Sequence, residues 1–149
     1  MSAKRIQNAV AAMAMMLGGC GSPPARVARG PVEPIAERLK TADPVAGATV
    51  FAACTACHTI GAGATDTDGP NLYGVVGGPV AGRRERFAYT AALREVGGIW
   101  DAPKLDRWLT DPQRFVPGTK MAFAGLPDSK QRADVIAYLA TQGGHLPSP

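Results

Sequence analysis

The sequence predicts a small all-α domain in which short helices are separated by long loops. Helical signals occur at residues 45–53, 101–110 and 128–142. The chain of 149 residues contains 18 glycines and 13 prolines, which indicates that much of the backbone is turn and loop. Only 6% of the residues are aromatic. We therefore expect one domain with a thin apolar core.

The predicted helices are recognised from their ends and from their apolar residues. Asp43-Pro44 places a capping carboxylate before a proline at the first helical position, ahead of residues 45–53. Asp101 caps the second helix, and the glycine pair at 143–144 closes the third. The inward faces of the second and third helices are formed by Leu105, Trp108 and Leu109, and by Val135, Ile136 and Leu139.

A Cys-Thr-Ala-Cys-His segment directly follows the first predicted helix. This pattern is the signature of covalent c-type haem attachment, in which Cys54 and Cys57 each bind a porphyrin vinyl group and His58 ligates the iron. A thioredoxin-like redox pair would require a βαβ unit, and a structural zinc site would require four ligands. The only other cysteine and histidine are Cys20 and His145. We therefore predict one covalently bound haem c, which would add to the thin core.

Residues 1–20 are predicted to be a signal segment. Lys4-Arg5 precedes the apolar run 9–17, which is too short to span a bilayer as a mature helix. The following Leu17-Gly18-Gly19-Cys20 resembles the lipobox of bacterial lipoproteins, in which the cysteine is lipidated after cleavage. The alternative is an ordinary cleavable signal with an incidental cysteine. Both predict export to the periplasmic side, and the first predicts a membrane anchor at Cys20.

Residues 21–41 are predicted to form a linker or tether. Four prolines, few large apolar residues and scattered charges are not the composition of a core, although residues 35–40 have the pattern of a single helical turn. The expected domain organisation is therefore a signal segment (1–20), a linker (21–41), a haem domain (42–145) and a tail (146–149).

The net charge of +4 arises outside the predicted domain. Lys4 and Arg5 contribute two positive charges, and residues 21–41 contribute a further net two. From residue 42 onward ten basic residues balance ten acidic residues. No basic stripe interleaved with aromatic residues is present, so a nucleic-acid partner is not expected.

Two further segments resemble the class I cytochromes c of the mitochondrial and related bacterial type. The first is Gly69-Pro70-Asn71-Leu72, about a dozen residues after the haem histidine. The second is Pro117-Gly118-Thr119-Lys120-Met121, followed by Ala122 and then Phe-Ala-Gly at 123–125, and it is far more specific than the haem motif. The resemblance covers about residues 42–142. It implies a small class I cytochrome c fold, with three main helices plus loops wrapped around one haem.

The resemblance also implies roles for single residues. The Pro70 carbonyl would accept a hydrogen bond from His58, which fixes the imidazole tautomer. Met121 would be the distal iron ligand, and a His/Met pair raises the iron potential. Without the resemblance, Met121 is equally well explained as core filler. Four further residues match positions that hold the haem propionates, with ordinary polar roles as the alternative: Tyr89, Thr90, Trp100 and Thr119.

The sequence departs from the family pattern at two places. Gly77-Gly78-Pro79 stands where many relatives have Gly-Arg, so a propionate-facing arginine is missing, and the arginines at 83, 84 and 86 are candidates to replace it. Trp108 stands where mitochondrial members have a tyrosine. Both departures leave the redox potential open.

The function implied by the resemblance is one-electron transfer in a respiratory chain rather than enzymatic catalysis. The carrier would shuttle electrons between a quinol-oxidising cytochrome complex and a terminal oxidase or similar acceptor at the membrane surface. One alternative is an electron-entry subunit of a periplasmic dehydrogenase, which would have the same sequence features. A second is a haem peroxidase, which would need an open coordination position and a distal acid/base, and no second histidine lies where it would serve.

Overall fold

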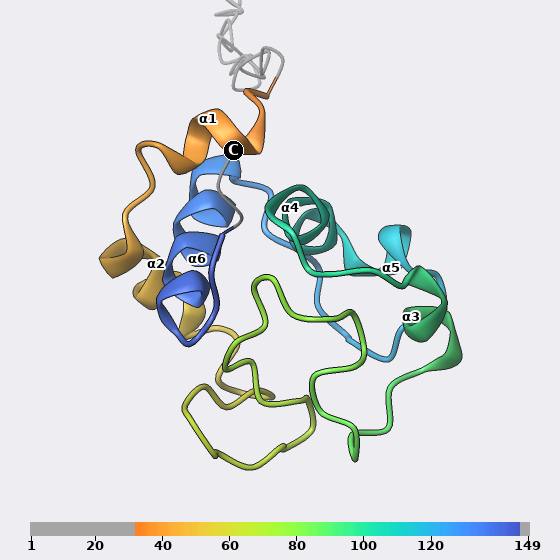
Figure 1. Ribbon diagram of the computed structural model, residues 1–149. Coiled ribbons are helices and arrows are strands. Elements are labelled where there is room, and N and C mark those ends of the chain that lie inside the picture. Colours follow the sequence, from red (N-terminus) through yellow and green to blue (C-terminus); the bar gives the residue numbers. More distant parts are fainter. Residues whose placement is uncertain (1–31, 147–149) are drawn as a thin grey trace, which may run out of the picture. The chain divides into compact units, whose positions relative to one another are not determined.

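The computed structural model describes residues 32–146. The predicted signal segment with Cys20, the linker up to residue 31 and residues 147–149 lie outside the described residues. Within 32–146 the chain forms helices and loops without a strand (Figure 1). The extended pairing in this part of the chain is an isolated bridge between Pro79 and Ile99. The helices are α1 (Ile35–Leu39), α2 (Pro44–Phe51), α3 (Ala91–Val96), α4 (Ala102–Thr110), α5 (Pro112–Phe115) and α6 (Ser129–Thr141). The all-α prediction is confirmed.

The three predicted helices correspond to α2, α4 and α6. Their aspartate caps are present: Asp43 accepts from the Val45 N–H, Asp101 from the Lys104 N–H and Asp128 from the Lys130 N–H, at 2.7–2.8 Å. Helix α2 ends at Phe51, two residues earlier than predicted, because residues 52–57 continue as tight turns. Helix α6 is followed by a glycine at 143 with φ +73°, as expected of a helix end.

Helices α2 and α6 cross at close range. A Cβ atom at Gly47 would lie 2.0 Å from the Asp134 carbonyl oxygen, so only glycine permits this approach. On the same side the rings of Phe51 and Tyr138 lie 5.3 Å apart. The Asp43 backbone N–H donates to the Asp134 carboxylate at 2.9 Å, which ties the start of α2 to α6. The crossing fixes the helix that leads directly into the Cys-x-x-Cys-His segment.

Two short helices were not predicted. Helix α3 is capped by Thr90, whose Oγ accepts from the Leu93 N–H at 3.2 Å. Helix α5 begins immediately after α4 because Asp111 ends α4 and also caps α5, accepting from the Arg114 N–H at 3.0 Å. Both helices are too short to show an apolar period in the sequence, so only their caps were detectable.

The packed part of the chain begins before residue 42, where the sequence predicts the haem domain to start. Helix α1 lies within the predicted linker, yet its Ile35 is only 7% exposed and belongs to the apolar core. Helix α1 packs against α4 and α6. The packed domain therefore begins about ten residues earlier than its proline-rich composition suggested, because tertiary contacts outweigh the low local propensity.

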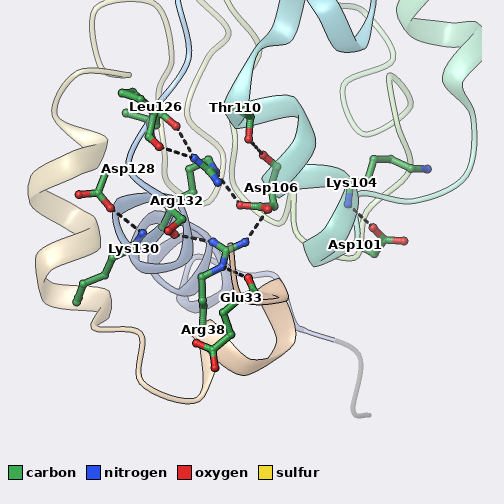
Figure 2. A network of polar contacts seen from close by, with 12 residues as sticks. Glu33, Arg38, Asp101, Lys104, Asp106, Thr110, Leu126, Asp128, Lys130 and Arg132 are labelled. Atoms are coloured by element: carbon green, nitrogen blue, oxygen red, sulfur yellow. Dashed lines mark hydrogen bonds and ion pairs between the residues drawn. The ribbon is translucent and has the colours of Figure 1, made fainter. Parts of the chain in front are cut away.

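A buried ion network fastens α1 (Figure 2). Asp106 on α4 lies between two arginines, with one carboxylate oxygen 2.7 Å from Arg38 and the other 2.7 Å from Arg132 of α6. Arg38 also donates to the carbonyl oxygens of Glu33 and Ser129 at 2.8 and 2.6 Å. The side chains of Arg38 and Arg132 are 9% and 6% exposed. Removing the shared Asp106 would leave two buried guanidinium groups without their carboxylate partner, which costs about 3–5 kcal/mol.

Candidate functional site

The Cys-x-x-Cys-His segment is a compact turn that extends α2. The Cys54 N–H donates to the Phe51 carbonyl at 2.8 Å, and the His58 N–H donates to the Cys54 carbonyl at 2.9 Å. Both cysteines are free thiols; Cys54 is half-buried and Cys57 is exposed. Burial raises the pKa of the Cys54 thiol. Two unpaired thiols and an imidazole are thus presented by one turn.

The imidazole of His58 is held by the backbone carbonyl of Pro70. Its Nδ1 lies 2.7 Å from the Pro70 carbonyl oxygen. Because a carbonyl only accepts, Nδ1 carries the proton and donates, and the lone pair stays on Nε2. Gly69 packs so closely against the ring that a Cβ atom there would be 2.4 Å from the His58 Cε1 atom. The contact expected between His58 and Pro70 is present, and the ring is oriented to offer Nε2 to a metal.

Residues 59–74, which we call the proximal loop, are organised by Asn71. This side chain is 4% exposed. Its amide nitrogen donates to the carbonyls of Gly61 and Ala64 at 2.9 and 2.8 Å, and its oxygen accepts from the Tyr73 N–H at 2.9 Å. The Asn71 N–H donates to Asp66 at 2.8 Å. One buried side chain therefore fixes the loop that supplies the Pro70 carbonyl.

Asp66 joins the proximal loop to the segment that carries the arginines at 83, 84 and 86. Its carboxylate is 2.7 Å from Arg84, which also donates to the Ala64 carbonyl at 3.2 Å. Burial alone would raise the pKa of Asp66, but the Asn71 N–H and the Arg84 guanidinium lower it, and the net pKa is below the ordinary value. Arg83 donates to the Tyr73 carbonyl at 3.1 Å. Arg83 and Arg84, two of the suggested arginine replacements, are thus bonded to this loop, whereas Arg86 is exposed.

Residues 116–126, which we call the methionine loop, carry Met121. This side chain is half-buried and packs against the core. The Met121 N–H donates to the Thr119 hydroxyl at 3.3 Å, and Thr119 is 9% exposed. Gln113 on α5 donates to the carbonyls of Thr119 and Met121 at 3.2 and 2.9 Å. The part of the methionine loop next to Met121 is therefore held by the side chains of Thr119 and Gln113.

The remaining predicted site residues lie in different surroundings. Trp100 is 7% exposed and its ring lies 5.5 Å from that of Trp108. Thr90 caps α3, and its hydroxyl proton stays available because the cap uses only the oxygen. Tyr89 is half-buried beside Phe87, with ring centroids 5.0 Å apart. Burial, then the negative charge of Asp66, raises the pKa of Tyr89, while nearby arginines oppose the shift.

The residues fit a covalently bound haem. Within residues 32–146 no group of three or more His, Cys, Asp or Glu side chains could hold a metal ion directly. The donor set is instead two free thiols, one imidazole with a free Nε2 and one thioether, which suits an iron porphyrin. Several apolar side chains that pack against the core stay partly exposed: Ile60, Leu72, Leu93, Val96 and Phe115.

Comparison with known proteins agrees with this site. The family model for cytochrome c matches residues 44–143. The chain belongs to the cytochrome c family. Members of this family carry one covalently bound c-type haem with iron and are electron carriers rather than enzymes. The predicted family, cofactor and non-enzymatic role are therefore confirmed.

Individual cytochromes show how far the similarity extends. A cytochrome c homolog of Bradyrhizobium diazoefficiens is 44% identical over 117 residues, which is 78% of this chain and 63% of the relative. Cytochrome c2 of Rhodomicrobium vannielii is 48% identical over 102 residues, covering 68% of this chain and 81% of the relative. Among solved structures, cytochrome cH from Methylobacterium extorquens has a TM-score of 0.63 and 43% identity, over 66% of this chain and 98% of the other.

Two features of this cytochrome were not predicted from the sequence. Asn71 lies in a recognised motif, but its three side-chain hydrogen bonds were not foreseen. Gln113 carries no sequence signal, because an exposed glutamine in a polar stretch is ordinary surface composition.

No helix within residues 32–146 combines the length and apolar character needed to cross a bilayer.

Proposed function

We propose that this chain is a one-electron carrier in which His58 and Met121 ligate a haem bound to Cys54 and Cys57. The contact between His58 Nδ1 and the Pro70 carbonyl at 2.7 Å carries the proposal, because it places the proton of a neutral imidazole on Nδ1 and so leaves the Nε2 lone pair for a metal. When bound, the haem supplies an iron that alternates between Fe(III) and Fe(II). The partners would be a quinol-oxidising cytochrome complex and a terminal oxidase or similar acceptor at the membrane surface.

The protein side chains have three tasks in this proposal. His58 and Met121 would ligate the iron, and the soft thioether of Met121 would favour its reduced state. With both ligands supplied by the protein, no position on the iron would be open to oxygen or peroxide, which favours electron transfer over peroxidase chemistry. Trp100, Tyr89, Thr90 and Thr119 would donate hydrogen bonds to the haem propionates, which are costly to bury unpaired.

The optical spectrum of the purified holoprotein tests the axial ligands. We expect the oxidised protein to show the weak far-red band of sulfur ligation to Fe(III), and Met121→Ala to lose it and to bind carbon monoxide when reduced. Met121→His is the matched variant, because it restores a closed sixth position without sulfur and should lack both the band and carbon monoxide binding. A wild-type protein without the band, or a band that survives in Met121→Ala, would contradict His/Met ligation.

The electron-entry subunit of a periplasmic dehydrogenase is the second candidate, since it would need the same haem site. Purification from native membranes separates the two. A free carrier should elute alone and be reduced by a quinol-oxidising complex, whereas a subunit should elute with a dehydrogenase and be reduced by that enzyme's substrate.

We also propose that the carrier is exported and anchored through a lipid on Cys20. The support is the Leu17-Gly18-Gly19-Cys20 sequence after the short apolar run. The full-length chain should then fractionate with membranes and enter detergent, while Cys20→Ser should not. If both chains are recovered in the soluble periplasmic fraction, the cysteine is incidental to an ordinary cleavable signal.

A further inference from the structure

The central part of the methionine loop lacks backbone pairing. The loop is fixed at its start by the Thr119 N–H, which donates to the Val116 carbonyl at 3.0 Å. At its end the Leu126 N–H donates to the Leu109 carbonyl at 2.7 Å. Within the described chain, residues 120–125 form no backbone–backbone hydrogen bond. The conformation around Met121 must therefore be maintained by side chains.

Gln113 bonds to the loop on both sides of Lys120. Its Nε2 atom lies 3.2 Å from the Thr119 carbonyl and 2.9 Å from the Met121 carbonyl. Both partners are acceptors, so the amide must present its NH₂ group and uses one hydrogen for each. A single side chain thus links the backbone of Thr119 to that of Met121 and fixes the conformation of Lys120 between them.

Gln113 is attached to a well-packed part of the backbone. Gln113 follows Pro112, whose side chain is fully buried, and lies on the one-turn helix α5. Helix α5 is capped by Asp111 and follows α4 without a linker. The side chain of Gln113 therefore starts from a fixed point of the core and reaches out to a loop that has no pairing of its own.

We propose that Gln113 is a positioning residue that holds the methionine loop closed, so that Met121 stays on the iron and the sixth position stays unavailable to other ligands. The inference rests on the proposed His/Met ligation. Gln113 touches neither iron nor haem in this role and acts through the two carbonyls. Because Gln113 is exposed, water competes for the same carbonyls. Its two bonds therefore set how often the loop opens and not whether the domain folds.

Imidazole binding to the oxidised holoprotein measures this opening. Imidazole reaches the iron only when Met121 has left, so its apparent affinity is proportional to the open fraction. Loss of two partly solvated hydrogen bonds should raise that fraction, and Gln113→Ala should bind imidazole about three- to tenfold more tightly than wild type. Gln113→Glu keeps the shape but has no donor, and should show an increase of the same size.

Two controls separate positioning from general destabilisation. Gln131 is an exposed glutamine on α6 whose side chain makes no hydrogen bond within the described residues, so Gln131→Glu should leave imidazole affinity unchanged. In Gln113→Ala the far-red band should disappear on heating well below the temperature of global unfolding. Unchanged imidazole affinity in both Gln113 variants, with the far-red band present in wild type, overturns this inference alone. Absence of the band in wild type overturns the proposed ligation instead.

Discussion

The proximal loop and the methionine loop each supply one side of the proposed iron site, but they are stabilised differently. The proximal loop is fixed from inside by a buried asparagine that satisfies three backbone groups. The methionine loop is fixed from outside by an exposed glutamine that satisfies two. Buried hydrogen bonds are costly to lose and exposed ones are not, because water replaces them. Under the proposed ligation, ligand exchange is therefore expected on the methionine side, with His58 staying in place.

The largest difference between the loops should follow removal of their central amides. Asn71→Ala leaves the Tyr73 N–H and two carbonyls without their partner in a buried position, and should lower the free energy of unfolding by about 3 kcal/mol. Gln113→Ala should lower it by about 1 kcal/mol or less. Denaturant titration of both holoproteins measures this. Equal losses in the two variants would remove the distinction between the loops.

A smaller effect is expected from Gly69→Ala. The new methyl group would lie 2.4 Å from the His58 ring, and His58 is held by Pro70, so either the ring or the loop must move at a cost of about 2 kcal/mol. Gly61→Ala is the matched control in the same loop, because its Cβ would meet nothing closer than 3.9 Å. Denaturant titration together with the haem spectrum reports both effects. A Gly69→Ala protein as stable as Gly61→Ala would mean that the proximal loop yields easily.

The smallest effect concerns pH. A lowered pKa means that Asp66 stabilises the folded state above its unfolded pKa and loses this contribution as the pH falls through the folded pKa. The contribution should therefore be complete above the ordinary aspartate pKa of 3.8 and decline across the acid range below it, and Asp66→Asn should remove it. The methionine loop contains no Asp or Glu and should add no such dependence. The free energy of unfolding of wild type and Asp66→Asn is measured across this pH range. Equal pH dependence in the two proteins would contradict the role of Asp66.

Local signals explain what the sequence could predict. Aspartate caps placed α2 and α4, and inward apolar residues with a closing glycine pair placed α6. The His58–Pro70 contact followed from a motif that keeps its spacing. Helix α1 was assigned to a linker because nothing in residues 35–39 reveals that Asp106, nearly seventy residues away, neutralises Arg38. Gln113 was missed for a related reason, since its role depends on the path of a loop that its own neighbours do not specify.

The attachment of α1 has a mechanical consequence. A force applied at Val32 would act on α1 first. The hydrogen bonds of Arg38 to Asp106 and to the Ser129 carbonyl would transmit it to α4 and α6. The residues that join α1 to α2, and with them the turn that carries Cys54 and Cys57, lie beyond this point of fixation. A force on the N-terminal segment would therefore act on α4 and α6 before it acts on the turn that carries Cys54 and Cys57.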